Sequence, residues 1–347
     1  MCNIAGYAGT RPAAPILLEM MRRQEGLCGG YYSGIATIHE GKIYYTKLTG
    51  DLPRLEMLTN AANLPGTVGI IHSRSNSGGG DNWSHPFVST RNGEVLQAYV
   101  ANGSAGIFAP RRQQDSVLAE ELLHQGYDMN SRDATAREGY PALSDGSGVH
   151  MSDAMCQLIR RNIDRGQPMD IAMAEAYLQM PGEIVGLLLS VTDPDGIAWS
   201  RINMPMMLAF CDHGAYLASS AMGIPEDARE PIPLPACACG MVYRDSYTVK
   251  PFKELPCTVA PVTAQVRKLA YDAMCQAMKK DALSIGPLQD VVEPFFPKAD
   301  CVPVTLVVYD VLLSLREEGR LKWECRRLPG AREDLDAPKL YFSLAED

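Results

Sequence analysis

A cysteine directly follows the initiator methionine, and it is the residue of this chain that most clearly could do chemistry. Methionine is readily removed when the next side chain is small, and its removal would leave Cys2 with a free α-amine. An α-amine has a pKa near ~8, so it can take the proton of its own thiol at neutral pH. Nucleophile and base would then belong to one residue. Position 2 alone is weak evidence, because a cysteine can occur there by chance.

Further short motifs follow in a fixed order over about residues 1–250, beginning with the run Cys2-Asn3-Ile4-Ala5-Gly6. They continue with His72-Ser73-Arg74, with Asn82, His85 and Pro86, with Asn102-Gly103, with a helical segment at 116–126, and with Asp153. Each motif is weak, but their order and spacing together resemble class II glutamine amidotransferases. Within that class the motifs resemble the glutaminase domain of glucosamine-6-phosphate synthase, without its synthase domain.

The resemblance implies a catalytic role for three residues. The Cys2 thiolate would attack the side-chain amide carbon of L-glutamine. The side-chain amide of Asn102 and the backbone N–H of Gly103 would stabilise the tetrahedral oxyanion, and losing one such donor typically costs ~3 kcal/mol. No cofactor and no metal ion are expected.

Three more residues are implied to hold the substrate. Arg74 would bind the α-carboxylate through its two-pronged guanidinium, and Asp153 would bind the α-ammonium group. Ser77 stands where the family commonly has threonine and would add a hydrogen bond. Two plainer interpretations stay open: Asp153 as the N-cap of a helix, and Arg74 as the partner of a surface acid.

The sequence also departs from the family pattern. Asn3 replaces a glycine, Ala101 replaces a histidine, and the run 75–78 replaces Trp-Ala-Thr-His. Glutamine or a related γ-amide therefore remains open as the substrate. His72 and His85 are interpreted as structural, because activation of the thiol by the α-amine leaves no need for an imidazole.

The order of secondary structure indicates an α+β fold. A strand is predicted at residues 3–8, with more strands up to residue 102. Helices are predicted at 116–125, from Ser152 or Asp153 to 163, and at 168–180, and strands return from 183 to 249. This order disfavours a doubly wound parallel sheet. For residues 2–250 the resemblance implies the four-layer αββα sandwich of N-terminal nucleophile hydrolases.

A second, small domain is predicted at residues 262–347, after a proline-rich stretch at 251–261. Helices at 263–280, 288–296 and 304–319 precede strand-like runs at 321–327 and 339–344, an arrangement that resembles a winged helix. Asp310, Glu317 and Glu318 on the third helix make contact with DNA unfavourable. We interpret this tail as a packing or association module, which leaves a homo-oligomer open.

Composition excludes several classes of protein. The net charge is −9 and no block of Lys or Arg occurs, so nucleic acid is not expected as a partner. The longest apolar run is far too short for a membrane span, and no signal peptide is expected. The ten cysteines show neither a disulfide framework nor the spacing of a metal site. A reducing cytoplasm is the predicted compartment.

Two enzymatic functions and one non-enzymatic function remain. In the first, the chain hydrolyses glutamine to glutamate and ammonia through a Cys2 thioester and passes the ammonia to a separate synthase or transferase subunit. In the second, it is a free-standing amidohydrolase that acts on another γ-glutamyl amide. The third is a catalytically retired domain kept for regulation or binding, which retention of the five residues Cys2, Arg74, Asn102, Gly103 and Asp153 argues against.

Overall fold

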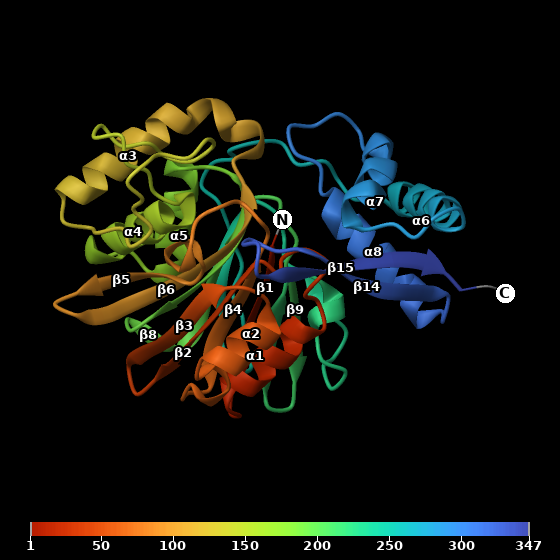
Figure 1. The fold of residues 1–347 in the computed structure, drawn as a ribbon, viewed down its shortest axis with the longest axis horizontal. Coiled ribbons are helices and arrows are strands. Elements are labelled where there is room, and N and C mark those ends of the chain that lie inside the picture. Colours follow the sequence, from red (N-terminus) through yellow and green to blue (C-terminus); the bar gives the residue numbers. More distant parts are fainter. Residues whose placement is uncertain (1, 346–347) are drawn as a thin grey trace.

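The structure, a computed structural model, describes residues 2–345 and has two stacked β-sheets at its centre (Figure 1). The first sheet is antiparallel throughout, and β1, which starts at Asn3, lies in its interior. The chain therefore runs from Cys2 directly into a central strand, as predicted. In spatial order the strands are β11 (Ile232–Pro233), β9 (Met207–Cys211), β10 (Gly214–Ala218), β1 (Asn3–Gly9), β4 (Val68–Arg74), β2 (Tyr32–His39) and β3 (Lys42–Thr49).

The second sheet is also antiparallel, and its strands come from the middle of the chain. Both of its faces are covered, so β7 is buried along almost its whole length and its sequence is nearly continuously apolar. In spatial order the strands are β13 (Lys250–Pro251), β12 (Ala238–Val242), β8 (Asp193–Arg201), β7 (Glu183–Ser190), β6 (Glu94–Ser104) and β5 (Phe87–Arg91).

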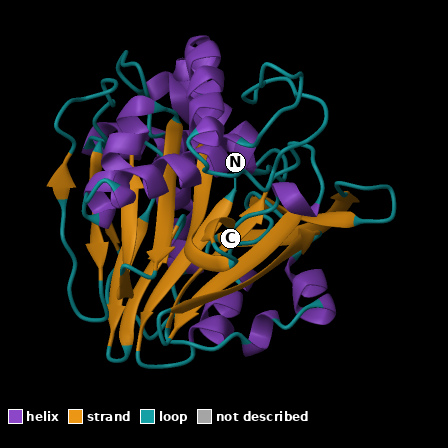
Figure 2. Cartoon of the chain, turned by 90° about the vertical axis from the view of Figure 1, so that its left-hand side faces the viewer, coloured by secondary structure: helices purple, strands orange, loops and turns teal. Residues whose placement is uncertain are grey.

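Helices cover the outer faces of the two sheets (Figure 2). α1 (Ala13–Arg22) and α2 (Leu52–Leu58) pack on the first sheet. α4 (Met151–Asp164) and α5 (Met169–Gln179) pack on the second sheet, and α3 (Arg112–His124) packs on α4. Four short 3₁₀ helices connect these elements: η1 (Ala61–Asn63), η2 (Asp81–Trp83), η3 (Gly106–Arg111) and η4 (Ala221–Gly223).

Three apolar layers hold this sandwich together. One lies between the sheets, one beneath α1 and α2, and one beneath α4 and α5. Representative members are Ile4, Val100 and Leu187 in the first layer, Leu17 and Ile35 in the second, and Met155 and Tyr177 in the third. Three cores between four layers confirm the predicted αββα arrangement.

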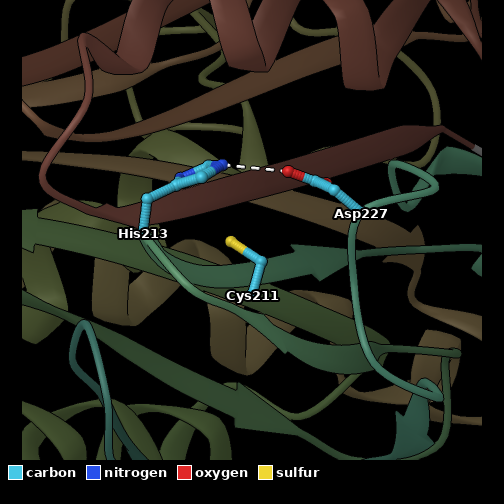
Figure 3. Close-up of side chains that lie close together, drawn as sticks. All are labelled: Cys211, His213 and Asp227. Carbon is cyan, nitrogen blue, oxygen red and sulfur yellow. Dashed lines mark hydrogen bonds and ion pairs between the residues drawn. The ribbon is translucent and has the colours of Figure 1, made fainter.

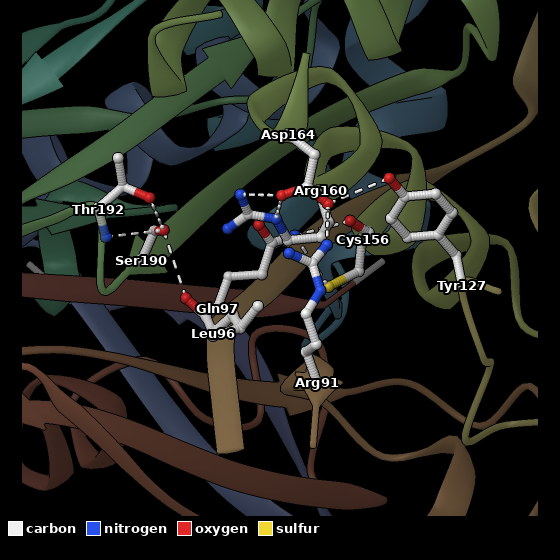
Figure 4. A network of polar contacts seen from close by, with 9 residues as sticks. All are labelled: Arg91, Leu96, Gln97, Tyr127, Cys156, Arg160, Asp164, Ser190 and Thr192. Carbon is white, nitrogen blue, oxygen red and sulfur yellow. Dashed lines mark hydrogen bonds and ion pairs between the residues drawn. The ribbon is translucent and has the colours of Figure 1, made fainter. Parts of the chain in front are cut away.

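Polar contacts fasten α4 to the second sheet (Figure 4). The Gln97 side chain on β6 donates to the Cys156 carbonyl at 2.7 Å, so its buried amide nitrogen is paired with a helix backbone. At the end of α4, Asp164 accepts from Arg160 at 2.9 Å and also from Arg91 of β5. These contacts fix the helix whose first turn borders the cavity described below.

The remaining residues form a smaller unit, drawn in blue in Figure 1. Helix α8 is buried on the side that faces the rest of this unit, and Leu27 and Met222 of the sandwich extend the same core. The elements are α6 (Ala264–Met278), α7 (Ile285–Val292), η5 (Glu293–Phe295), α8 (Val304–Glu317), β14 (Leu321–Pro329) and β15 (Asp336–Leu344). Three helices and a hairpin thus occur in the predicted order, while the winged-helix class of this domain and the boundaries 2–250 and 262–347 stay predictions.

Two local predictions were wrong. The helix predicted at 116–125 begins earlier, at Arg112, because the 3₁₀ helix η3 runs directly into α3. Helix α2 was not predicted, although its N-cap Asp51 accepts from Arg54 N at 3.2 Å. No helix among residues 2–345 is both long and apolar enough to cross a membrane.

Candidate active site

The register of two central strands places the predicted nucleophile. β1 pairs with β4 so that Asn3 lies opposite Ser73, which puts Cys2 opposite Arg74. Alternate residues of a strand share a face, so Cys2, His72 and Arg74 all face the second sheet. Cys2 is buried, with 7% of its surface exposed. Residues 72 positions apart in the sequence thus form one corner of the space between the sheets.

A hydrogen bond joins Cys2 to the second sheet. The backbone nitrogen of Cys2 donates to Oδ1 of Asn102 at 2.8 Å. With Oδ1 facing this nitrogen, the amide nitrogen of Asn102 is the part of the side chain left to serve as a donor. Asn102 lies near the end of β6, opposite Val185 of β7, so its position is set by the ladder of the second sheet.

Gly103 follows at a place where only glycine fits. Its φ is +141°, and a Cβ there would lie 1.9 Å from the carbonyl oxygen of Glu183. Glycine is the residue that adopts such a conformation without steric cost. Gly103 also borders the cavity that contains the Cys2 thiol. Asn102 and Gly103 thus both lie beside Cys2, and their role as the oxyanion site stays a prediction.

The Cys2 thiol is acidified by its surroundings. Burial raises its pKa, but the nearby His72 side chain acts against burial, and the pKa falls to about 6. Nε2 of His72 donates to the carbonyl oxygen of Ala101 at 2.9 Å, because a carbonyl can only accept. Nδ1 is therefore the ring atom left to act on Cys2; it has no hydrogen-bond partner among residues 2–345, and the Cys2 sulfur itself lies 3.8 Å from Ser75 Oγ. His72, interpreted from the sequence as structural, is thus part of the site.

A cavity of about 370 Å³ opens in front of Cys2. Four of the six predicted residues line it: Cys2, Arg74, Ser77 and Gly103. Asn102 lies behind it, in contact with Cys2. Residues that the sequence did not single out complete the wall, among them Ser75, Tyr99, Arg112, Tyr140, His150 and Ser152.

Arg74 is buried and already holds much of the loop that follows it. Its guanidinium donates to Trp83 O at 3.0 Å and to Ser77 Oγ at 2.6 Å. A further bond reaches Gly78 O at 2.8 Å, and the ring of Tyr32 lies 4.3 Å from the guanidinium carbon. Arg74 does not pair with a surface acid. It shapes the cavity wall and presents a cation to it, while Ser77 is oriented by the same contact.

Asp153 lies outside the cavity. Its carboxylate accepts from Ser131 N at 2.8 Å and from Gln157 Nε2 at 3.2 Å, and the residue is fully buried. It is not the N-cap of α4 either, since His150 takes that position and accepts from Ser152 N at 3.1 Å. The structure brings the other five predicted residues together, and a substrate-binding role for Asp153 stays a prediction without geometric support.

Arg112 is a second cation at the cavity that sequence reasoning missed. It is the first residue of α3, and one of its terminal nitrogens lies 2.9 Å from the sulfur of Met151. Burial lowers its pKa, which the nearby carboxylate of Asp115 partly offsets. The predicted start of this helix fell four residues later, so no sequence signal placed Arg112 near Cys2.

One group of three side chains among residues 2–345 has the composition of a metal site. Cys211, His213 and Asp227 lie together far along the first sheet, at the turn between β9 and β10 (Figure 3). His213 contacts Asp227 at 3.0 Å and the hydroxyl of Tyr7 at 2.9 Å. Both ring nitrogens are thus engaged, and we interpret the group as a structural polar cluster.

Comparison with known proteins places this geometry among glutamine-dependent enzymes. The chain is 29% identical over 298 residues to a glutamine–fructose-6-phosphate aminotransferase (isomerizing) of Chlorobaculum tepidum, covering 84% of the chain and 43% of the relative. The corresponding protein of Pyrococcus horikoshii is 27% identical over 253 residues, covering 72% and 38%. The chain thus spans less than half the length of these relatives. No protein-family profile matches it.

A solved structure supports the fold. Glutamine phosphoribosylpyrophosphate amidotransferase of B. subtilis, complexed with ADP and GMP, superposes with a TM-score of 0.59 at 14% identity, over 81% of this chain and 59% of that one. Together the comparisons confirm the predicted relationship to class II glutamine amidotransferases and the N-terminal nucleophile hydrolase fold.

The acidified thiol gives a first prediction. In the intact protein, the rate of Cys2 alkylation by iodoacetamide should rise with pH and level off above a midpoint near 6, because the thiolate is the reactive form. His72→Ala removes the group that lowers the pKa, so alkylation at pH 6.5 should slow by at least about tenfold. Peptide mapping by mass spectrometry measures the rate at Cys2, and the exposed His124→Ala serves as control. An unchanged profile in His72→Ala would show that His72 does not act on the thiol.

A second prediction separates the two cations of the cavity. Arg74→Lys keeps the charge but not the planar fork, so KM for a substrate with an α-carboxylate should rise on the order of tenfold or more. Arg112→Gln tests whether the second cation shares this role. Steady-state kinetics with thermal denaturation as a folding check makes the comparison. Equal KM values in wild type and Arg74→Lys would remove Arg74 from the carboxylate site.

Proposed function

We propose that this chain hydrolyses the side-chain amide of L-glutamine to glutamate and ammonia through a thioester on Cys2. The observation that carries the proposal is the position of Cys2, which lies beside β4 of the first sheet and contacts Asn102 of the second sheet. There the acidified thiol, the Asn102–Gly103 donors and the Arg74 cation surround one cavity. The relatives' names, which describe glutamine-dependent enzymes, support the same chemistry.

The steps follow from the positions of these groups. The Cys2 thiolate attacks the amide carbon, and the carbonyl oxygen becomes an oxyanion that Asn102 Nδ2 and the Gly103 N–H stabilise. The leaving nitrogen takes a proton and departs as ammonia, which leaves a thioester. Water then attacks the thioester, glutamate leaves, and the thiolate returns. The proton is carried by the α-amine of Cys2 or by Nδ1 of His72.

The role of the α-amine depends on removal of Met1. Met1 lies outside the described residues, so its removal stays a prediction. In the processed chain the α-nitrogen would keep Asn102 Oδ1 as an acceptor, which fixes its direction beside the thiol. His72 supplies an additional route for proton transfer that does not depend on processing.

The ammonia would pass to a separate synthase or transferase subunit. The name of the C. tepidum relative, which describes transfer to fructose 6-phosphate, supports an acceptor of this kind. Self-association through the C-terminal domain is the other assembly that we propose for testing.

One observation favours a second candidate, an amidohydrolase that acts on another γ-glutamyl amide. Asp153, the predicted ligand for the α-ammonium group, lies outside the cavity and is held by Ser131 and Gln157. Among residues 2–345 no Asp or Glu lines the cavity. A γ-amide whose α-nitrogen is acylated carries a carboxylate but no ammonium group, and it fits such a wall.

Amide hydrolysis by untagged protein is the test. Wild type should release glutamate from glutamine, Cys2→Ala should release none, and Cys325→Ala, which removes an exposed cysteine, should retain full activity. Intact mass should show a chain that begins at Cys2. A panel of γ-amides that includes N-acylglutamine separates the two candidates. Activity that survives in Cys2→Ala would refute the proposed chemistry.

A further inference from the structure

The C-terminal domain packs against a loop of the sandwich next to the candidate active site. This loop, residues 24–31, connects α1 to β2. Leu340 of β15 donates from its backbone nitrogen to Gly26 O at 2.8 Å, and Leu27 is buried in the core of the C-terminal domain. An ion pair between Arg327 and Asp51, 2.8 Å long, lies beside them. The loop is therefore held between the two domains.

One chain of contacts leads from the C-terminal domain to the residue after the nucleophile. The hydroxyl of Tyr309, on α8, lies 3.6 Å from the Cys28 sulfur. The backbone nitrogen of Cys28 donates to Oδ1 of Asn3 at 3.1 Å. Asn3 is fully buried and is joined by a peptide bond to Cys2. Two contacts thus separate a C-terminal side chain from the backbone of the nucleophile.

The Asn3 side chain also affects the pKa of Tyr309 directly. Nδ2 of Asn3 is buried and has no hydrogen-bond partner in the described part of the chain. Burial raises the pKa of Tyr309 well above its usual value, and the Asn3 side chain acts against this rise. The Asn3 amide is thus buried close enough to Tyr309 to affect its pKa. Asn3 is also one of the positions at which the sequence departs from the glycine of the family.

A second contact reaches the strand that carries the arginine. Gly30 has a φ of +88°, and a Cβ there would lie 2.5 Å from Cδ of Pro338 on β15. The backbone nitrogen of Gly30 donates to Ser73 Oγ at 2.8 Å. Ser73 lies between His72 and Arg74 in β4. The C-terminal domain is therefore linked through loop 24–31 to both strands that form the site.

We propose that Tyr309 is a positioning residue for the glutaminase site: through Cys28 and Asn3 it fixes the backbone that carries Cys2. The C-terminal domain is then a structural part of the active site, and its docking controls turnover. This inference rests on the function proposed above and adds a means by which the second domain regulates it.

The expected consequence is a loss of rate. The thiol must lie both within reach of His72 and opposite the oxyanion donors, and a displacement of about 1 Å far from the chemistry can cost on the order of 10²-fold in rate. Tyr309 does not touch the cavity, so substrate binding depends on it only weakly. A fall in kcat with little change in KM distinguishes positioning from substrate contact.

The test uses full-length Tyr309→Phe, which keeps the ring and removes the hydroxyl. We expect kcat for amide hydrolysis to fall about tenfold, KM to stay within about twofold, and the midpoint of Cys2 alkylation to move above 6 as the thiol leaves His72. The control is Tyr271→Phe in the same domain, whose hydroxyl bonds to Glu318 on the surface. Tyr271→Phe should change neither kcat nor KM nor the midpoint of Cys2 alkylation.

A double-mutant cycle tests the path. In the background of Asn3→Ala, Tyr309→Phe should have little further effect, because interacting residues are not additive. If Tyr309→Phe folds poorly, Cys28→Ala interrupts the same path and should give the same kinetic change.

A folded Tyr309→Phe with unchanged kcat and an unchanged alkylation profile overturns the inference. If wild type hydrolyses none of the amides, the proposed function fails. The alkylation profile alone then tests whether Tyr309 positions Cys2. A shifted profile then supports the positioning role, and an unshifted one overturns it.

Discussion

The hydrogen bond from the Cys2 backbone nitrogen to Asn102 Oδ1 joins the first residues of the chain to the opposite sheet, and the site depends on it. A chain end would ordinarily lose order, because few contacts hold it. Here β1 lies between β10 and β4 in the middle of a sheet, and burial of Ile4 between the sheets fixes its register. A slip by one residue would turn Cys2 to the opposite face. The nucleophile is thus held by the same register that builds the core.

The fold and most of the site were predictable because they depend on local patterns that the sequence shows directly. Strands on either side of a helical middle gave the layers, and Asn102-Gly103 stands out as a short motif. Asp153 was predicted to bind substrate because its position matches the family. Its side chain instead accepts a hydrogen bond from Ser131, a contact that depends on tertiary packing. Arg112 was missed because η3 continues directly into α3, and no capping residue marks the start of α3 in the sequence.

His72 shows a different limit of sequence reasoning. The argument that the α-amine suffices as a base made an imidazole unnecessary. It could not reveal that the pairing of β1 with β4 places this ring on the same face as the thiol. Nor could it reveal that the Ala101 carbonyl fixes Nε2 as a donor and so leaves Nδ1 as the ring atom without a hydrogen-bond partner among residues 2–345. The tautomer of His72 and the direction of its ring depend on contacts between strands that lie apart in the sequence.

The charge of the cavity limits what it can bind. Arg74 and Arg112 supply two cations, while the Cys2 thiolate is the one anion that lines the wall among residues 2–345. Burial of a charge is costly unless a partner balances it. A ligand with a carboxylate improves this balance, whereas an ammonium group would depend on carbonyl and hydroxyl oxygens or on the thiolate itself. An ammonium group beside the thiolate would stabilise the thiolate and so make it a weaker nucleophile. The proposed substrate would therefore be held mainly by its carboxylate, and the chemistry at the α-nitrogen is the feature on which glutamine and a blocked γ-amide differ.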